Sequence, residues 1–199
     1  MRVFTSITDP ELITLIQKGA VGVLPTDTVY GLVCNAANPA SVKRLYELKA
    51  RINKPGTVIA GKVQQLIDLG LRARYLKAVE HFWPNSLSVI VPCDPELQYL
   101  DSGKGLAVRI PAHAIVHTLL LQTGALLTSS ANQPGQPTAT TLAEAQSYFG
   151  DSVDFYVDGG TIADHAPSTV VRVVDDVVEV LRVGAVKLDE YGRIITNDL

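Results

Sequence analysis

Two cations at the end of an expected helix, Lys49 and Arg51, are the first residues whose types and spacing suggest chemistry. Arginine presents a planar pair of N–H donors that matches phosphate oxygens, and lysine adds a mobile positive charge. Together they can neutralise a triphosphate and the charge that develops when pyrophosphate leaves, so both are candidate catalytic residues. The alternative is that they only complement the dipole of the helix C-terminus. Their spacing alone does not separate these interpretations.

Two polar segments follow expected strands and are candidates for binding small ligands. Ser129-Ser130-Ala131-Asn132 offers hydroxyls and an amide that can bind phosphate, ribose or carboxylate without carrying charge. The 25–31 segment holds two threonines, an aspartate and a tyrosine, which can recognise the ammonium and hydroxyl groups of a small amino acid. Each segment is also compatible with an ordinary polar turn.

Two other groups of residues resemble a metal site and a hydrolase triad, but each lacks part of the required pattern. His113 and His117 have metal-ligand spacing, but the HExxH pattern and a third ligand are missing, so we expect structural histidines and no protein-bound metal. Asp164, His165 and Ser168 are too close in sequence for a hydrolase triad, and no Gly-x-Ser-x-Gly turn occurs. Walker A and GxGxxG motifs are absent as well.

Composition bounds the classes of protein that are possible. With 199 residues, 47% of them hydrophobic and 19% charged, the chain suits one folded domain. A net charge of −3 argues against nucleic-acid binding as the main function. The basic 43–54 segment could nevertheless bind a small polyanion. Two distant cysteines without a CxxC pair, and no long apolar stretch, predict a cytoplasmic protein without a membrane segment.

The elements that must position these residues follow from hydrophobic patterning and caps. Asp9-Pro10 and Asn38-Pro39 each combine an N-cap with a first-turn proline. Helices are predicted near 10–19, 39–50, 63–69, 73–82, 112–123 and 141–149. Strands are predicted near 20–24, 57–60, 87–91, 106–110, 125–128, 154–157, 168–174 and 177–182. This mixture predicts an α/β sheet with both parallel and antiparallel pairs.

Polar residues gather where several of these strands end. The loops 25–31 and 128–138 and the strand end at Arg109 fit this description, and ligands bind at such ends in open α/β sheets. We therefore expect the loops to converge on one cavity. The predicted domain covers residues 1–186, and residues 187–199 are expected to form a loose C-terminal tail.

Six segments in order resemble the YrdC/TsaC family, the L-threonylcarbamoyladenylate synthases, in its single-domain form. They are PTDTVYGL (25–32), KAR (49–51), AVRIPAH (107–113), SSAN (129–132), PSTVV (167–171) and LRVG (181–184). The resemblance spans about residues 20–184. It implies a YrdC-like twisted mixed sheet, flanked by helices, with a concave and positively lined substrate cavity.

The resemblance also implies an activity and a set of binding residues. The activity is that of a nucleotidyltransferase, which forms threonylcarbamoyl-AMP and pyrophosphate from L-threonine, bicarbonate or CO2, and ATP. L-Threonine is expected at Thr28, Tyr30, Arg109, Thr128 and Ser168. ATP is expected at Lys49, Arg51, Ser130, Asn132, Thr138 and Arg182.

The resemblance extends to cofactors and partners. Mg2+ is expected to be carried by ATP rather than by a cage of protein ligands. The product would pass to a tRNA threonylcarbamoyl transferase complex for the threonylcarbamoyladenosine modification of tRNA. Weak binding of tRNA itself is compatible with the family's role.

The sequence departs from the family pattern at three places. Ile52 follows KAR where proline is usual, Val183 replaces the proline of LRPG, and Ile59-Ala60 stand where histidine is frequent, which leaves the contacts of residues 52–60 open. Two other functions are considered: an RNA-binding module of the same fold, and a carbamoyl-phosphate-dependent domain that forms a carbamoyl-adenylate. The acidic net charge disfavours the RNA-binding module. Substrate dependence distinguishes the two enzymes, because only the threonylcarbamoyl-AMP synthase requires both threonine and bicarbonate.

Overall fold

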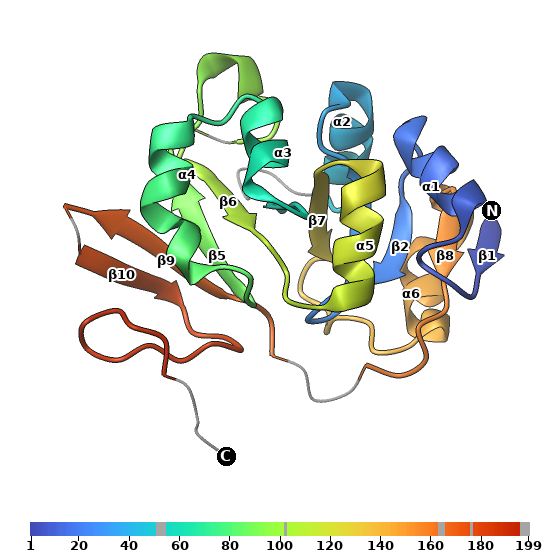
Figure 1. Cartoon of the computed structure of the whole chain (residues 1–199). Coiled ribbons are helices and arrows are strands. Elements are labelled where there is room, and N and C mark those ends of the chain that lie inside the picture. Colours follow the sequence, from blue (N-terminus) through green and yellow to red (C-terminus); the bar gives the residue numbers. More distant parts are fainter. Residues whose placement is uncertain (51–54, 102, 163–165, 176, 196–199) are drawn as a thin grey trace.

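The structure is a computed structural model and describes residues 1–50, 55–101, 103–162, 166–175 and 177–195 (Figure 1). Its strands form one ten-stranded sheet within the described residues, in the order β1-β8-β2-β3-β7-β4-β6-β5-β9-β10. The strands are β1 Arg2–Phe4, β2 Gly22–Pro25, β3 Tyr30–Asn35, β4 Thr57–Ile59, β5 Leu87–Val91, β6 Leu106–Arg109, β7 Leu126–Ser130, β8 Phe155–Val157, β9 Thr169–Val174 and β10 Val177–Arg182. The sheet contains four parallel pairs (β1–β8, β2–β8, β4–β6, β5–β9) and five antiparallel ones among the described residues, which confirms the mixed α/β sheet.

Helices cover both faces of this sheet (Figure 1). The α-helices are α1 Pro10–Gln17, α2 Pro39–Leu48, α3 Val63–Asp68, α4 Ala73–Val79, α5 Ala114–Thr123 and α6 Leu142–Phe149. Short 3-10 turns lie at Glu80–Phe82, Pro95–Leu97 and Gly150–Ser152. No described helix has the length and apolar character that crossing a membrane requires.

Local capping explains where the predicted helices begin. Asp9 Oδ1 accepts a hydrogen bond from Glu11 N at 2.8 Å, with Pro10 in the first turn of α1. Asn38 Oδ1 accepts one from Ser41 N at 3.2 Å and does the same for α2. Both interactions satisfy backbone donors that have no partner inside the helix, as the sequence predicts.

Two hydrophobic clusters fill the two faces of the sheet. Helices α2, α3, α4 and α6 contribute to the larger cluster, and α1 and α5 pack on the smaller one. Ile59 on β4 and Leu126 on β7 belong to the smaller cluster. Thr57 is two residues from Ile59, and Thr128 is two residues from Leu126, with which Ile59 pairs. Because side chains alternate along a strand, both threonines lie on the same face of the sheet as the smaller cluster. There the wall of the cavity replaces the apolar core.

Strand β3 was not predicted, because the 25–31 segment was interpreted as a loop. Pro25 on β2 instead pairs with Tyr30 on β3, so a tight turn joins two antiparallel strands. Five of the six β3 residues are buried, on both faces. A strand covered on both sides lacks the period-two alternation that reveals a half-buried strand.

The C-terminal residues also differ from the expected loose tail. Leu188 and Ile194 form an isolated antiparallel bridge and pack against the larger cluster. Asp189 Oδ1 accepts hydrogen bonds from the backbone N–H groups of Tyr191 and Arg193. Residues 187–195 are therefore a structured turn, and 196–199 lie outside the described residues.

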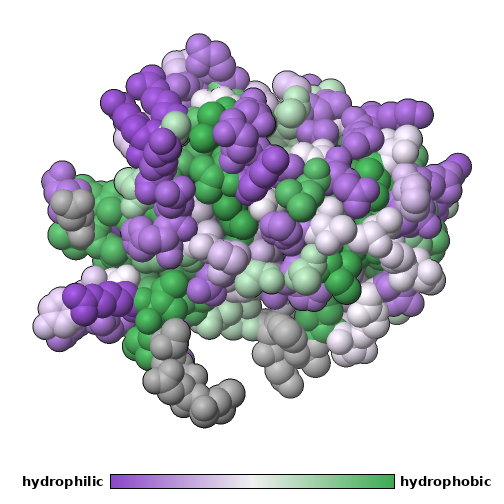
Figure 2. All heavy atoms as spheres, viewed as in Figure 1, coloured by the Kyte–Doolittle hydropathy of each residue, from purple (hydrophilic) through white to green (hydrophobic). Residues whose placement is uncertain are grey.

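The β9–β10 hairpin forms one end of the sheet. Val174 and Val177 near its tip are exposed. Figure 2 shows a hydrophobic area at the left of the molecule, where Figure 1 draws this hairpin. Its pairing is irregular near the other end, where the register shifts between Val180 and Arg182. Such a shift is typical of a β-bulge, which redirects the side chains that follow it.

Candidate active site

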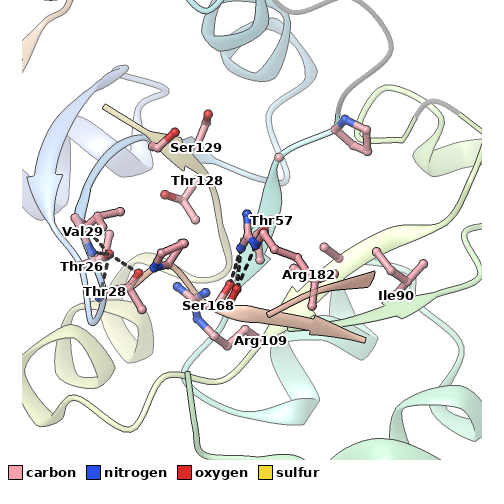
Figure 3. Close-up of a pocket in the computed structure, with 16 residues that line it drawn as sticks. Thr26, Thr28, Val29, Thr57, Ile90, Arg109, Thr128, Ser129, Ser168 and Arg182 are labelled. Atoms are coloured by element: carbon pink, nitrogen blue, oxygen red, sulfur yellow. Dashed lines mark hydrogen bonds between the residues drawn. The ribbon is translucent and has the colours of Figure 1, made fainter. Parts of the chain in front are cut away.

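A cavity of about 300 Å3 opens on the face of the sheet that carries the smaller cluster (Figure 3). Its wall is built by the β2–β3 turn, by strands β4 to β7 and by the β9–β10 hairpin, so segments far apart in sequence converge as predicted. The lining residues are Thr26, Thr28, Val29, Pro55, Gly56, Thr57, Ile90, Ala107, Arg109, Thr128, Ser129, Ser130, Pro167, Ser168, Val170 and Arg182.

The most buried charge in this wall is the guanidinium of Arg109. Its Nη2 donates to Asp27 Oδ1 at 2.7 Å, and the two side chains are only 4% and 3% exposed. Ser86 Oγ donates to the other carboxylate oxygen at 3.1 Å. Burial lowers the pKa of Arg109, while the charge of Asp27 and its hydrogen bond raise it. An arginine retains its proton in such surroundings, so a fixed positive charge faces the cavity.

Two buried polar atoms of the wall have no hydrogen-bond partner among the described residues. They are Arg109 Nε and Ser129 Oγ. Leaving a buried donor unpaired costs about 1–3 kcal/mol, so such atoms in a folded protein require an explanation. Both residues belong to the wall of the same cavity, and a guanidinium N–H is a donor suited to a carboxylate oxygen.

A second arginine, Arg182, lies across the same wall (Figure 3). Its Nε and Nη2 donate to Ser168 O at 3.0 and 2.7 Å, and Nη2 also donates to Ser168 Oγ at 3.0 Å. Ser168 Oγ lies 3.0 Å from Ser88 Oγ, which accepts from Arg109 Nη1 at 3.4 Å. Two hydroxyl groups thus connect the two cationic groups of the wall.

The β2–β3 turn presents Thr28 to the cavity, and Thr26 organises that turn. Thr26 Oγ1 donates to Val29 O at 2.6 Å and accepts from the N–H groups of Thr28 and Val29. Gly31 follows on β3, where a Cβ atom would lie 2.6 Å from Thr128 Oγ1. The absence of a side chain at this position lets β3 pass directly beside the threonine of β7.

Lys49 ties the end of α2 to the loop after β7. Its Nζ donates to Ser130 O at 2.8 Å, to Asn132 Oδ1 at 2.6 Å and to Asn132 O. Ser130 Oγ donates to Asn132 Oδ1 at 2.7 Å, so one amide oxygen accepts from both neighbours. The lysine ammonium therefore stabilises the Ser130–Asn132 turn, although Lys49 itself does not line the cavity.

The structure brings most of the predicted binding residues to one wall. Those that line the cavity are Thr28, Arg109, Thr128, Ser130, Ser168 and Arg182. Lys49 and Asn132 lie one hydrogen bond behind Ser130, Thr138 lies on the following loop, and Arg51 is outside the described residues. Their roles as ligand contacts stay predictions.

Tyr30 is placed differently from what the sequence suggests. It is fully buried and is not among the residues that line the cavity. Its hydroxyl donates to Gly160 O at 2.8 Å and accepts from Gly159 N at 2.9 Å, which anchors the segment after β8. Burial raises the pKa of this phenol, against the opposing effect of the Gly159 hydrogen bond.

Three other residues of the site were not predicted in their observed roles. Asp27 was expected to recognise an ammonium group, but in the structure it pairs with Arg109. Ser86 and Ser88 were not predicted at all. Ser88 did leave a signal, because it is the one polar residue in the apolar run Leu87–Val91, and buried hydroxyls need hydrogen-bond partners.

The fold and the cavity define a class: a twisted mixed-sheet α/β protein whose cavity wall carries two arginines suited to anionic ligands. Residues 14–184 match the model of the Sua5/YciO/YrdC family, whose description reads "Telomere recombination". The chain therefore belongs to the Sua5/YciO/YrdC family.

Relatives with curated names agree with this membership. The chain is 32% identical to the threonylcarbamoyl-AMP synthase of Bacillus subtilis over 200 residues, which cover 96% of this chain and 58% of that protein. It is 32% identical to the putative threonylcarbamoyl-AMP synthase of Mycobacterium leprae over 190 residues, 92% of this chain and 86% of that one. The chain thus spans little more than half of the first relative's length and most of the second's.

A solved structure shares the fold. The structure of Pyrococcus abyssi Sua5 complexed with L-threonine superimposes with a TM-score of 0.82 at 26% identity. The similarity covers 94% of this chain and 59% of the Pyrococcus chain. The fold described above is therefore shared with part of the Pyrococcus protein.

Proposed function

We propose that this chain is a threonylcarbamoyl-AMP synthase, a nucleotidyltransferase that uses L-threonine, bicarbonate or CO2, and ATP. The observation that carries this proposal is the pair of arginines, Arg109 and Arg182, in the wall of one cavity. Two cations so placed suit two anionic ligands bound side by side, an amino-acid carboxylate and a nucleotide phosphate. The names of relatives 32% identical to this chain support the same activity.

The amino-acid part of the proposal centres on Arg109. Its guanidinium would donate to the carboxylate of L-threonine, while Asp27 fixes one end of the group through Nη2. Thr28, Thr128 and Ser168 supply hydroxyls around the same space, suited to the hydroxyl and carboxylate oxygens of threonine.

The nucleotide part of the proposal lies toward Ser130 and Arg182. Arg182 and the sequence-predicted Arg51 would contact phosphate oxygens, and Ser130 and Asn132, with Lys49 behind them, would hold the nucleotide. Thr138 is a further candidate on the same loop. Mg2+ would enter with ATP as part of the substrate. Among the described residues no group of three or more His, Cys, Asp or Glu side chains is arranged to bind a metal.

The proposed reaction needs positioning more than protein nucleophiles. The threonine amine attacks CO2, a C–N bond forms, and the amine proton passes to a base in solution, which gives a carbamate. A carbamate oxygen then attacks the α-phosphorus of ATP, the bond between the α-phosphorus and the bridging oxygen breaks, and pyrophosphate leaves with the electron pair. Fixed cations would stabilise the charge that develops, and the ordered wall would hold the reactants in line.

The remaining parts of the proposal concern the surroundings of the enzyme. The acyl-adenylate product would be transferred to tRNA by a separate threonylcarbamoyl transferase complex, with weak tRNA binding by this chain. We place the reaction in the cytoplasm, where ATP, threonine and tRNA occur together.

Mass spectrometry of a reaction with ATP, L-threonine and bicarbonate tests the activity. We expect threonylcarbamoyl-AMP and pyrophosphate, both lost when threonine or bicarbonate is omitted. Formation of a carbamoyl-adenylate from carbamoyl phosphate without threonine would instead support the alternative enzyme. Tight tRNA binding at physiological salt without any adenylate would support an RNA-binding module.

A further inference from the structure

Ser88 is in contact with the site although it is not one of the residues that line the cavity. It is fully buried on β5, and its Oγ lies within hydrogen-bond distance of both Arg109 and Ser168. Ser168 lines the cavity and also accepts from Arg182. Ser88 thus connects the guanidinium proposed for the amino-acid carboxylate to a hydroxyl on the cavity surface.

The direction of the hydrogen bond between the two serines follows from counting donors. A guanidinium only donates, so Ser88 Oγ accepts from Arg109 and Ser168 Oγ accepts from Arg182. Each hydroxyl then has one proton left. For the proton of Ser88, the described residues offer one acceptor, Ser168 Oγ at 3.0 Å. An undonated proton in this fully buried position would go unpaired, which is costly.

The same count decides what Ser168 offers to a ligand. With its oxygen accepting from Ser88 and Arg182, its own proton has no acceptor among the described residues other than Ser88 itself. That proton therefore points away from both partners, toward the cavity that Ser168 lines. A hydroxyl that is fixed as a donor recognises an anionic oxygen and disfavours an N–H group in the same place.

We infer that Ser88 is a positioning residue that fixes the Ser168 hydroxyl as a hydrogen-bond donor toward the carboxylate of the amino-acid substrate. The inference rests on the proposed function, because it names the ligand group that Ser168 meets. Ser88 itself touches no ligand. Its effect is transmitted through Ser168, and this separates it from a residue that only supports Arg109.

Ser86 provides a matched control two residues earlier in the chain. Its hydroxyl donates to Asp27 at 3.1 Å, and Asp27 pairs with Arg109. Ser86 therefore supports the same guanidinium, but no hydrogen bond connects it to Ser168 among the described contacts. Removing its hydroxyl disturbs Arg109 without releasing Ser168.

A double-mutant cycle on threonine binding tests the inference. Calorimetry measures the threonine dissociation constant of the parent, Ser88→Ala, Ser168→Ala and the double variant, and then repeats the cycle with Ser86→Ala in place of Ser88→Ala. We expect Ser88→Ala to weaken threonine binding about tenfold in the parent, equivalent to ~1.4 kcal/mol. In the Ser168→Ala background the same change should cost less than about twofold, because the group it positions is gone.

The control and the nucleotide define the outcomes that overturn the inference. Ser86→Ala should have the same effect with or without Ser168, and the affinity of Ser88→Ala for a non-hydrolysable ATP analogue should stay within about twofold of the parent value. Additive effects of Ser88→Ala and Ser168→Ala would show that Ser88 is merely structural and would overturn the inference while leaving the proposed function intact. A folded parent that binds no threonine would overturn both.

A shape-preserving variant keeps the test available if Ser88→Ala does not fold. Ser88→Cys retains a side chain of similar shape, but its thiol is a weak donor and acceptor. We expect the same non-additive pattern with Ser168→Ala, at a smaller amplitude. Wild-type threonine affinity in folded Ser88→Cys, as judged by circular dichroism, would count against the proposed positioning.

Discussion

Two arginine–aspartate pairs of this protein have nearly the same length and very different surroundings. Arg109–Asp27 spans 2.7 Å in the cavity wall with side chains 4% and 3% exposed. Arg44–Asp154 spans 2.6 Å between α2 and the residue before β8, with side chains 41% and 37% exposed. Their distances alone would predict interactions of similar strength, but one pair is buried and the other is exposed to solvent.

The hydrogen bonds around each pair show what it is for. Asp154 Oδ2 also accepts from Val21 N, and Arg44 Nη2 donates to Ser152 O, so protein atoms complete this cluster. Arg109 instead retains an unpartnered Nε beside the cavity. A buried ion pair is a weak contributor to net stability but costs much when one partner is removed. The Arg44–Asp154 pair connects two elements, and we propose that the Arg109–Asp27 pair holds a positive charge in place for a ligand.

Removing the buried arginine should give the largest effect. Arg109→Ala should lower the free energy of unfolding by about 3–5 kcal/mol, because the Asp27 carboxylate stays buried without its counter-charge. Urea unfolding measures this loss. Arg44→Ala, the matched change in the exposed pair, should cost about 1 kcal/mol or less after solvent screening. Equal losses would contradict the distinction between the pairs.

The same two variants should separate even more clearly in ligand binding. Threonine affinity should fall by more than about a hundredfold in Arg109→Ala, while Arg44→Ala binds threonine like the parent. Calorimetry on the folded fraction measures both, with an ATP analogue as a second ligand. Threonine affinity unchanged in Arg109→Ala would exclude this residue as the carboxylate contact.

Lys49→Met extends the comparison to the buried ammonium group. The change removes the ammonium donor from Ser130 O and from both oxygens of Asn132. Ser130 O keeps the N–H of Asn132, and Asn132 Oδ1 keeps the hydroxyl of Ser130, so the turn should loosen without unfolding. We expect turnover to fall about 10–100-fold and the KM for ATP to rise more than that for threonine. Steady-state kinetics of adenylate formation measures this. Lys43→Met, which removes an exposed cation from the same helix, should change neither parameter, and a similar loss there would refute the assignment.

Asp154→Asn should have a smaller, pH-dependent effect on stability. Burial acts to raise the pKa of Asp154, but hydrogen bonds from Arg44 and Val21 outweigh it and hold this pKa below its usual value. A carboxyl group with a lowered folded-state pKa contributes stability above its unfolded-state pKa, and the contribution disappears as pH falls through the folded-state value. We expect a loss of about 1 kcal/mol at pH 6, and a difference from the parent that vanishes once the pH lies below the folded-state pKa of Asp154, in urea unfolding.

The cysteines should give the smallest response. Burial raises the pKa of Cys34 to about 12 and is the main cause that raises the pKa of Cys93 to about 11. Both are protonated at pH 8, so iodoacetamide should label them slowly in the folded protein and quickly after denaturation. Mass spectrometry of the labelled chain checks this. Fast labelling of Cys34 would mean that β3, which carries the turn beside the cavity, opens readily.

The features that could be predicted from the sequence depend mostly on interactions between residues close together in the chain. The starts of α1 and α2 follow from Asp9-Pro10 and Asn38-Pro39, whose capping contacts lie within three residues. Arg109 was predicted beside the cavity because it ends a strand-like run, and strand ends converge in this class of fold. Motif order added the placement of Thr28, Ser168 and Arg182 on one wall.

What could not be predicted depends on contacts between distant segments. Asp27 meets Arg109 across 82 positions of sequence, and Ser88 meets Ser168 across 80. Nothing in the immediate neighbours of Asp27 distinguishes a partner for an arginine from a ligand for an ammonium group. Tyr30 was misplaced for a related reason, because its orientation depends on β3, which the pattern of buried residues did not reveal.

The irregular pairing near the end of β10 determines on which side of the sheet Arg182 lies. Val180 is opposite Val171, which belongs to the larger cluster, whereas Arg182 is opposite Val170, which lines the cavity. In a regular strand, residues two positions apart share a side, and Arg182 would follow Val180 away from the cavity. Leu181 is the extra residue at this register shift, and it places the side chains of Val180 and Arg182 on opposite faces of the sheet. If Leu181 were instead paired regularly opposite Val170, Arg182 would move one position along the strand and its guanidinium would be directed to the opposite surface.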